Sequence, residues 1–180
     1  EDKGIMKFLS RKLAAIGFKC TIIKSKGTGP KPALNLYARF GNSKPHINFL
    51  GHTDVVTNLD NWSVPPFKGT IKNGQIISRG IADMKGSIAC WISAVSNFIK
   101  NNKFKGSISI IISADEETTG LGTPAVMKYL RRKGEKIDFS VVGEPSSNKS
   151  VGDEIRIGRR GSMNGIVTIY GKSGHSAFAG

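Results

Sequence analysis

One segment constrains the fold more than any other: residues 107–113 (SISIIIS) form a short, nearly continuous apolar run. A strand of this composition needs cover on both faces, as in a parallel sheet that lies between helices. A second segment of the same kind follows at 138–142 (DFSVV), and we expect another buried strand there. Helical patterns lie between the strands. The order of strand, helix, strand, helix, strand therefore predicts an α/β fold with a mostly parallel sheet flanked by helices.

The remaining elements follow from periodicity and from turn residues. Apolar spacing predicts helices over 5–16, before Gly17, and over about 84–100. Thr123-Pro124 predicts the cap and first residue of a third helix that ends near 132. Further strands are expected at 18–24, 33–40 and 46–50, a hairpin and loop at 57–83, and β-like segments from about 153.

The balance of charge is strongly basic, with 27 Lys and Arg against 13 Asp and Glu. The lysines are spread along the whole chain and no aromatic residues interleave with them, which argues against nucleic-acid binding. A basic surface would instead attract an anionic small-molecule substrate. No apolar run approaches the roughly 20 residues of a membrane span, so no membrane association is expected. Cys20 and Cys90 are too few for a disulfide scaffold; we expect buried thiols in a reducing cytoplasm.

Acidic residues and one histidine follow the predicted core strands. His52 and Asp54 come after 46–50, the acidic run 115–117 comes after 107–113, and Glu144 comes after 138–142, while Asp83 precedes the long helix. In open α/β sheets, ligands bind outside the carboxyl ends of the strands. Carboxylates gathered there repel one another unless a cation neutralises them. Mixed histidine and carboxylate ligands suit zinc, with cobalt or manganese as substitutes.

Each of these residues also has a purely structural explanation. His52 could be a hydrogen-bonded loop residue, Asp83 could cap the long helix, and 115–117 could be an exposed acidic turn. Their joint placement at strand ends favours a site over these separate explanations. His46, next to Pro45 at the start of a strand, is interpreted as structural. The serines form no Gly-x-Ser-x-Gly turn, so a serine hydrolase is not supported.

At this point a family resemblance is visible. The motifs that carry it are GHTDVV (51–56), GIADMKGS (80–87), DEE (115–117), GEPSS (143–147) and GRRGS (158–162), with NWSVPPF (61–67) and SGH (173–175) beside them. Together they resemble the M20 family of co-catalytic zinc peptidases and deacylases and, within it, the succinyl-diaminopimelate desuccinylases. The resemblance implies a zinc-peptidase-like catalytic domain, of which 1–158 would be the N-terminal segment. Residues 159–180 would begin an α+β lid or dimerisation domain of a homodimer in the bacterial cytoplasm.

The resemblance also implies roles for individual residues. His52, Asp83, Glu117 and Glu144 resemble the family's metal ligands, with Asp83 bridging two Zn²⁺ ions, for which Co²⁺ could substitute. Asp83 would precede a cis peptide bond to Met84. Glu116 resembles the general base.

Three further residues resemble family positions outside the ligand set. Asp54 resembles the partner that orients the ligand histidine. Arg159 resembles a residue that binds the substrate carboxylate, and His175 a lid histidine that reaches the neighbouring subunit's site.

The implied reaction is zinc-dependent hydrolysis of N-succinyl-LL-2,6-diaminopimelate to succinate and LL-2,6-diaminopimelate, on the route to lysine and cell-wall precursors. An acetylornithine deacetylase, a metallo-carboxypeptidase of the same family and an inactive metal-binding fragment remain as alternatives. Family members have one more zinc-binding histidine towards the C-terminus, and no histidine here other than His175 follows Glu144. We therefore expect an incomplete chain that binds one zinc tightly and has little activity alone.

Overall fold

The computed structural model describes residues 3–57 and 61–158 and, beyond them, 161, 163, 165–172, 174–175 and 177. The chain divides into two units, 1–145 and 146–180. The boundary that the sequence predicted after residue 158 lies inside the second unit. The two units are described separately.

The first unit is built on a five-stranded sheet in the order β1-β2-β6-β3-β7. Strands β3 and β6 are parallel, as are β3 and β7, whereas β2 is antiparallel to both of its neighbours. Four strands therefore point the same way and only β2 is reversed, which confirms the predicted α/β fold with a mostly parallel sheet. The strands are β1 (Lys19–Ser25), β2 (Ala33–Phe40), β3 (His46–His52), β6 (Ser107–Ser113) and β7 (Phe139–Val142).

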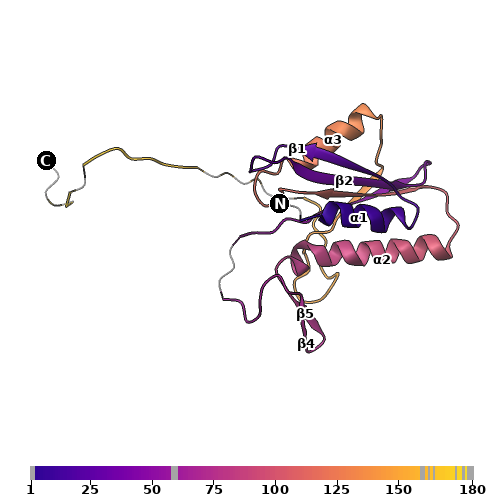
Figure 1. Ribbon diagram of the computed structural model, residues 1–180, viewed down its shortest axis with the longest axis horizontal. Helices are drawn as coiled ribbons and strands as arrows, with labels where there is room; N and C mark the ends of the chain where they lie inside the picture. The colour runs from indigo at the N-terminus through magenta and orange to yellow at the C-terminus, as the bar shows by residue number, and fades with distance from the viewer. Residues whose placement is uncertain are drawn as a thin grey trace. The chain divides into compact units, whose positions relative to one another are not determined.

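Helices cover both faces of this sheet (Figure 1). On one face lie α1 (Ile5–Ala14) and α2 (Gly86–Asn101), which pack Met6, Leu13 and Ile88 against the sheet. On the other face, α3 (Gly122–Arg132) packs Val126 and Leu130 against Tyr37 and Ile111. Successive residues of β6 point to opposite faces: Ile110 and Ile112 pack on the side of α1 and α2, and Ile111 packs on the side of α3. Every residue of β6 is buried. The prediction of a strand covered on both faces is confirmed.

Strand β7 corrects one sequence prediction. It was expected to be buried, yet all four residues are exposed, and Phe139 retains 64% of its accessible surface. The reason is its position, because β7 lies at the edge of the sheet and pairs only with β3. Composition reports that a strand is apolar, but it does not report which neighbours the strand will have.

Two smaller predictions were also wrong. α3 begins at Gly122 with Leu121 at the cap position and no side-chain cap, so Thr123 lies inside the helix and does not cap it. Of the two thiols, Cys20 is half-buried and Cys90 is exposed, because Cys90 lies on the outer face of α2. Neither error affects the placement of the main elements.

A small hairpin extends from the first unit, as the sequence predicted for 57–83. It consists of β4 (Thr70–Lys72) and β5 (Gln75–Ile77), joined by Asn73 and Gly74. Both joining residues have positive φ, 50° and 73°, which is the conformation that favours Asn-Gly in two-residue hairpin turns.

In the second unit, the carboxylate of Asp153 accepts backbone hydrogen bonds from residues 148–150. Its described residues after 153 contain no strand, contrary to the predicted β-like segments, and residues 165–172 are exposed. A strand needs a hydrogen-bonded neighbour, and the described part of this unit offers none. Within the described ranges, no helix is both long enough and apolar enough to cross a membrane.

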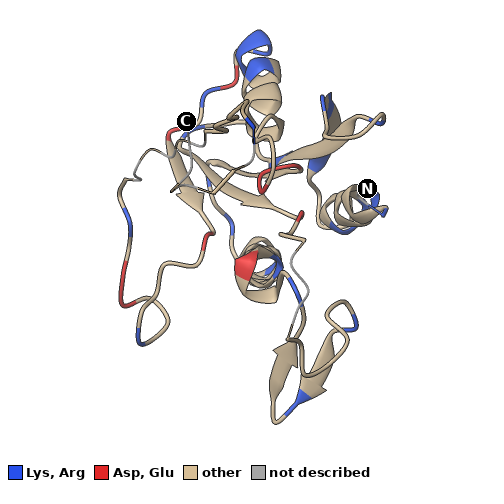
Figure 2. Cartoon of the chain, turned by 90° about the vertical axis from the view of Figure 1, so that its left-hand side faces the viewer, with Lys and Arg blue, Asp and Glu red and all other residues tan. Residues whose placement is uncertain are grey.

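Basic residues are distributed over the first unit. Figure 2 shows them on α1, at the end of α3 and on the β4–β5 hairpin. The acidic residues that follow the core strands lie apart from these positions, at one edge of the sheet.

Candidate metal centre

Three parallel strands bring the predicted site residues to one edge of the sheet. His52, at the end of β3, is in register with Ser113, at the end of β6, and Leu50 is in register with Val142 of β7. The loops that follow these strands therefore start side by side. Asp54, the run 115–117 and Glu144 belong to those loops, as the strand-end argument predicted.

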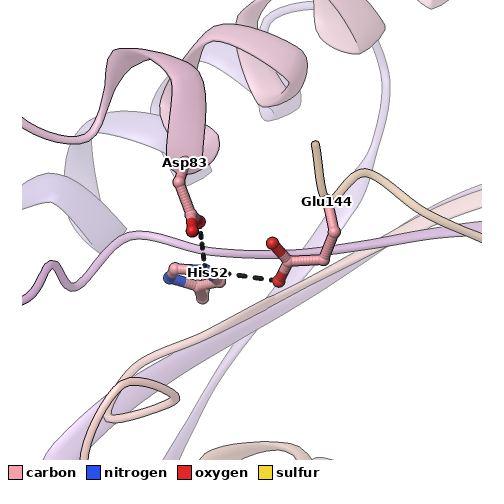
Figure 3. Close-up of side chains that lie close together, drawn as sticks. All are labelled: His52, Asp83 and Glu144. Atoms are coloured by element: carbon pink, nitrogen blue, oxygen red, sulfur yellow. Dashed lines mark hydrogen bonds and ion pairs between the residues drawn. The ribbon is translucent and has the colours of Figure 1, made fainter. Parts of the chain in front are cut away.

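His52 lies at the centre of the cluster. Its side chain is 2% exposed, and its Nε2 atom lies 3.0 Å from Asp83 Oδ1 and 3.4 Å from Glu144 Oε1. Figure 3 shows both carboxylates directed at the imidazole from different segments of the chain. A third carboxylate oxygen, Glu116 Oε2, lies 3.9 Å from the same nitrogen. One buried nitrogen thus faces three acidic side chains.

Asp54 holds the other side of the imidazole ring. Nδ1 of His52 lies 3.2 Å from the Asp54 carbonyl oxygen and 3.5 Å from its Oδ1. The second carboxylate oxygen of Asp54 accepts the backbone N–H of Glu117 at 2.9 Å. Asp54 therefore fixes the ring so that Nε2 faces the other carboxylates, and it also ties the β3 loop to the acidic loop after β6.

Asp83 is presented by an irregular turn before α2. Residues Ile81–Lys85 form one wide helical turn, η1, which is interrupted because Asp83 and Met84 have non-helical backbone angles. The peptide bond between these two residues is cis, as the family resemblance implied. α2 has Lys85 at its cap position and no side-chain cap, so the structure does not support Asp83 as a helix cap.

The Ser87 hydroxyl joins this turn to the end of β7. Its Oγ lies 2.8 Å from the carbonyl oxygen of Met84 and 2.6 Å from that of Gly143. These two carbonyls belong to the residues next to Asp83 and Glu144. Ser87 therefore helps to set the distance between the segments that carry the two carboxylates.

The three residues of the acidic run 115–117 do not share one role, because the first holds the loop and the other two face His52. Asp115 is buried, has a left-handed φ of 68°, and accepts hydrogen bonds from the hydroxyls of Thr118 and Thr119. Its carbonyl accepts the N–H of Gly120 at 2.7 Å. Asp115 thus organises the loop, and the next two residues face His52. The structure does not support the alternative of a simple exposed turn.

Electrostatics indicate that the cluster requires a positive charge. Burial lowers the pKa of His52, but the hydrogen bond to Asp54 and the negative charges of Glu144, Asp54 and Glu116 outweigh it and raise the pKa to about 9. Burial, together with the charge of Asp83, raises the pKa of Glu117. Both shifts reflect the negative charge gathered around His52 and Glu117, which a bound cation would offset, as metal ions do in such sites.

The donor atoms suit a divalent metal ion. Among the described residues, two groups each bring three possible ligand atoms within 4.8 Å of one another. One group is His52, Asp83 and Glu144, and the other is His52, Glu116 and Glu117. Histidine nitrogen and carboxylate oxygen are both zinc ligands, and catalytic zinc sites typically have three protein ligands and one open position. The first set consists of three of the four residues that the family resemblance implied as metal ligands.

Two of the predicted site residues are not placed at this centre. Arg159 lies outside the described residues. His175 belongs to the second unit, where it is exposed and its Nδ1 accepts the backbone N–H of Ala177 at 3.2 Å. Sequence reasoning in turn missed Lys85, Ser87 and Asp115 as parts of the centre. All three lie within or beside the quoted motifs, and that position was the only signal available.

Comparison with known proteins gives a consistent result. Residues 49–174 match the profile of peptidase family M20/M25/M40. A protein of Pelagibacter ubique named succinyl-diaminopimelate desuccinylase is 50% identical, with 98% of this chain and 47% of the relative covered. A protein of the same name from Rickettsia felis is 44% identical, with 99% and 48% covered. The chain spans about half the length of the curated relatives it matches.

Solved structures show the same fold at lower identity. Human carnosine dipeptidase 1 matches with a TM-score of 0.67 and 24% identity, over 77% of this chain and 31% of the other. An M20 family metallo-carboxypeptidase from Sulfolobus solfataricus matches with a TM-score of 0.67 and 23% identity, over 78% and 32%. The sheet with its acidic edge and the match over residues 49–174 lead to one conclusion: the chain belongs to peptidase family M20/M25/M40.

Proposed function

We propose that the protein containing this chain is a metal-dependent amide hydrolase that releases succinate from N-succinyl-LL-2,6-diaminopimelate. The observation that carries the chemistry is the convergence of three carboxylates on Nε2 of buried His52. The substrate is supported by relatives at 41–50% identity that are named succinyl-diaminopimelate desuccinylase. The basic net charge of +14 also suits an anionic substrate.

The metal we propose is zinc, for which cobalt can substitute, with two ions per complete site. His52, Asp83 and Glu144 would hold the first ion, while Asp83 and Glu117 would contribute to the second. Bound there, the metal supplies Lewis-acid chemistry, which polarises an amide carbonyl and makes water a better nucleophile at neutral pH.

The remaining residues of the site would bind substrate and move protons. Glu116 is half-exposed beside His52 and would take a proton from the attacking water and deliver it to the leaving amine. Asp54 would keep the His52 ring in position through its contacts with Nδ1. Arg159 would bind a carboxylate of the substrate. His175 would stabilise the oxyanion in the neighbouring subunit of a homodimer.

The activity is tested on a full-length polypeptide that carries these 180 residues. We expect succinyl-diaminopimelate to be hydrolysed with a higher kcat/KM than acetylornithine or a dipeptide. Arg159→Ala should raise KM for the succinylated substrate roughly tenfold or more, because a hydrogen bond to a charged group contributes about 1.5–3 kcal/mol. Arg156→Ala is the matched control, since Arg156 pairs with Glu154 at the surface. A preference for the acetylated substrate would contradict the proposal.

The metal content of the 180-residue chain gives a separate test. Both candidate ligand sets use His52, and its Nδ1 is directed at Asp54. Only Nε2 is then left for a metal, so we expect one zinc ion to bind tightly and a second only loosely. Isothermal titration calorimetry measures the stoichiometry. Two equally tight ions would show that the 180 residues supply the second ion with a further ligand besides Asp83 and Glu117.

We further propose a homodimer in the bacterial cytoplasm. Cys20 and Cys90 are both unpaired thiols, which suits a reducing compartment. Light scattering on the full-length polypeptide measures the mass of the assembly, and a monomer at working concentration would contradict the dimer. Cell fractionation tests the compartment.

A further inference from the structure

Lys85 lies beside the candidate metal centre, and none of the proposed chemistry uses it. It is the last residue of η1, two positions after Asp83, and its side chain is half-buried. Its Nζ donates a hydrogen bond to the carbonyl oxygen of Thr53 at 3.0 Å. Thr53 lies between His52 and Asp54. The lysine therefore connects the turn that carries Asp83 to the segment that carries the imidazole.

The space around the ammonium group is closely fitted. Gly80 has a φ of 81°, and a Cβ added there would lie 2.3 Å from Lys85 Nζ and 2.5 Å from Val55 Cγ1. The ammonium group thus occupies the place where any larger residue would put its side chain. The backbone N–H of Lys85 also donates to the Gly80 carbonyl at 2.8 Å, which closes the turn around the lysine. Together with the hydrogen bond to Thr53, these contacts place the ammonium group inside the turn.

The charge and the hydrogen bond of Lys85 have opposite consequences for metal binding. A positive charge near the site repels a dication, so its removal by itself would tighten metal binding. The hydrogen bond to Thr53 instead keeps two ligand-bearing segments in place, and its loss would weaken metal binding. Partners that orient metal ligands typically change metal affinity by about 10- to 100-fold. The sign of the change therefore separates the two effects.

We propose that Lys85 is a positioning residue, which holds the His52–Asp54 segment against the Asp83 turn so that the imidazole and the carboxylate meet one metal ion. This inference rests on the metal site proposed above. It assigns to Lys85 no contact with metal or substrate. The lysine acts through the Thr53 carbonyl, and the positioning effect exceeds the repulsion by its charge.

The test uses the 180-residue chain and two variants of the same position. Lys85→Met removes both the charge and the donor, while Lys85→Gln removes the charge but keeps an N–H donor. Lys100→Met, at the exposed end of α2, makes the same charge change away from the site. Zn²⁺ affinity is measured by calorimetry. The visible absorption of bound Co²⁺ reports coordination geometry, and circular dichroism reports folding.

We expect Lys85→Met to weaken Zn²⁺ binding roughly 10- to 100-fold and to alter the Co²⁺ spectrum. Lys85→Gln should fall between Lys85→Met and the unaltered chain, and Lys100→Met should match the unaltered chain. Equal or tighter binding by Lys85→Met, with an unaltered spectrum, would overturn the proposal. If Lys85→Met does not fold, Lys85→Gln decides on the same criteria. An unaltered chain that binds no metal would instead contradict the proposed metal site.

Discussion

Two histidines at opposite ends of β3 differ only in their surroundings. His46 and His52 begin and end the same strand, and both are almost fully buried. The ring nitrogens of His46 meet neutral partners, the Lys136 carbonyl at 2.8 Å and the Ser109 hydroxyl at 2.7 Å. Nε2 of His52 instead faces Asp83, Glu144 and Glu116. Burial and residue type are therefore the same, and the charge of the groups that face the ring nitrogens is not.

The difference follows from the direction of the parallel strands. The acidic loops follow the carboxyl ends of β3, β6 and β7, at one edge of the sheet. His46 lies at the opposite edge, where these strands begin. A closed set of neutral hydrogen bonds stabilises a fold but leaves no nitrogen for a ligand. The comparison shows that burial alone does not make a histidine a candidate metal ligand. His52 is a candidate because carboxylates face its Nε2 atom, whereas a hydroxyl faces Nε2 of His46.

The largest expected effect comes from truncating each histidine in turn. His52→Ala should bind zinc more than about 100-fold more weakly, since losing a ligand costs more than losing an outer partner. His46→Ala should keep zinc affinity but lower the free energy of unfolding, by about 1–3 kcal/mol, because the Lys136 carbonyl loses its ring partner and the Ser109 hydroxyl keeps only its hydrogen bond to Asn48. Calorimetry and denaturant unfolding measure the two quantities. Loss of zinc binding in folded His46→Ala would break the comparison.

The acidic loop sharpens the comparison at the His52 end. In a full-length polypeptide, Glu116→Gln should keep its metal content and lose at least about 100-fold of turnover, because Glu116 is proposed as base and not as ligand. Glu117→Gln should instead lower the metal content. Metal analysis beside steady-state kinetics separates these outcomes. If Glu116→Gln loses metal and keeps turnover, the two glutamates have been assigned in reverse.

A smaller effect is expected from Asp115, which holds the same loop without facing His52. Asp115→Ala removes the acceptor of the Thr118 and Thr119 hydroxyls and leaves both without that partner. We expect turnover to fall roughly tenfold, at the lower end of what supporting residues contribute. Asp153→Ala, which opens a comparable loop in the second unit, is the control. Equal losses in both variants would remove Asp115 from the site.

The last expected effect concerns folding in place of metal binding or turnover: the stability of the metal-free chain should depend on pH. The pKa of His52 is raised to about 9, above the usual value of 6.5, because the hydrogen bond to Asp54 and the nearby carboxylates outweigh its burial. A group with a raised pKa stabilises fully below pH 6.5 and loses that contribution as the pH rises through 9.

The free energy of unfolding of the unaltered chain, relative to His52→Gln, should therefore fall between these values. The decline is at most about 1.4 kcal/mol per pH unit. Denaturant unfolding in the presence of a chelator measures it. A difference that stays constant over this pH range would contradict the raised pKa.

Much of the fold and of the site could be predicted from the sequence. Periodicity placed α1, α2 and the central strands within a few residues, because each pattern reports a local preference for burial. The strand-end argument collected His52, Asp83 and Glu144 before any distance was known. The prediction of burial failed for β7, because this apolar strand lies exposed at the edge of the sheet. The pattern of apolar residues indicates a strand, but it does not indicate where in the sheet the strand lies, because that position depends on the rest of the chain.

By itself, the sequence determined the kinds of residue that follow each strand, and therefore the chemistry available at one edge of the sheet. Only the tertiary structure decided which acids point at His52 and which hold the loops. Asp115 and Glu116 are neighbours in the chain, yet the first is buried against threonine hydroxyls and the second faces the imidazole. Lys85 is part of the same motif as Asp83, and its ammonium group donates a hydrogen bond to the carbonyl of Thr53, which is distant in the sequence. The physical reason is that hydrogen bonds and charge pairs depend on distance and direction, which only the packed chain defines.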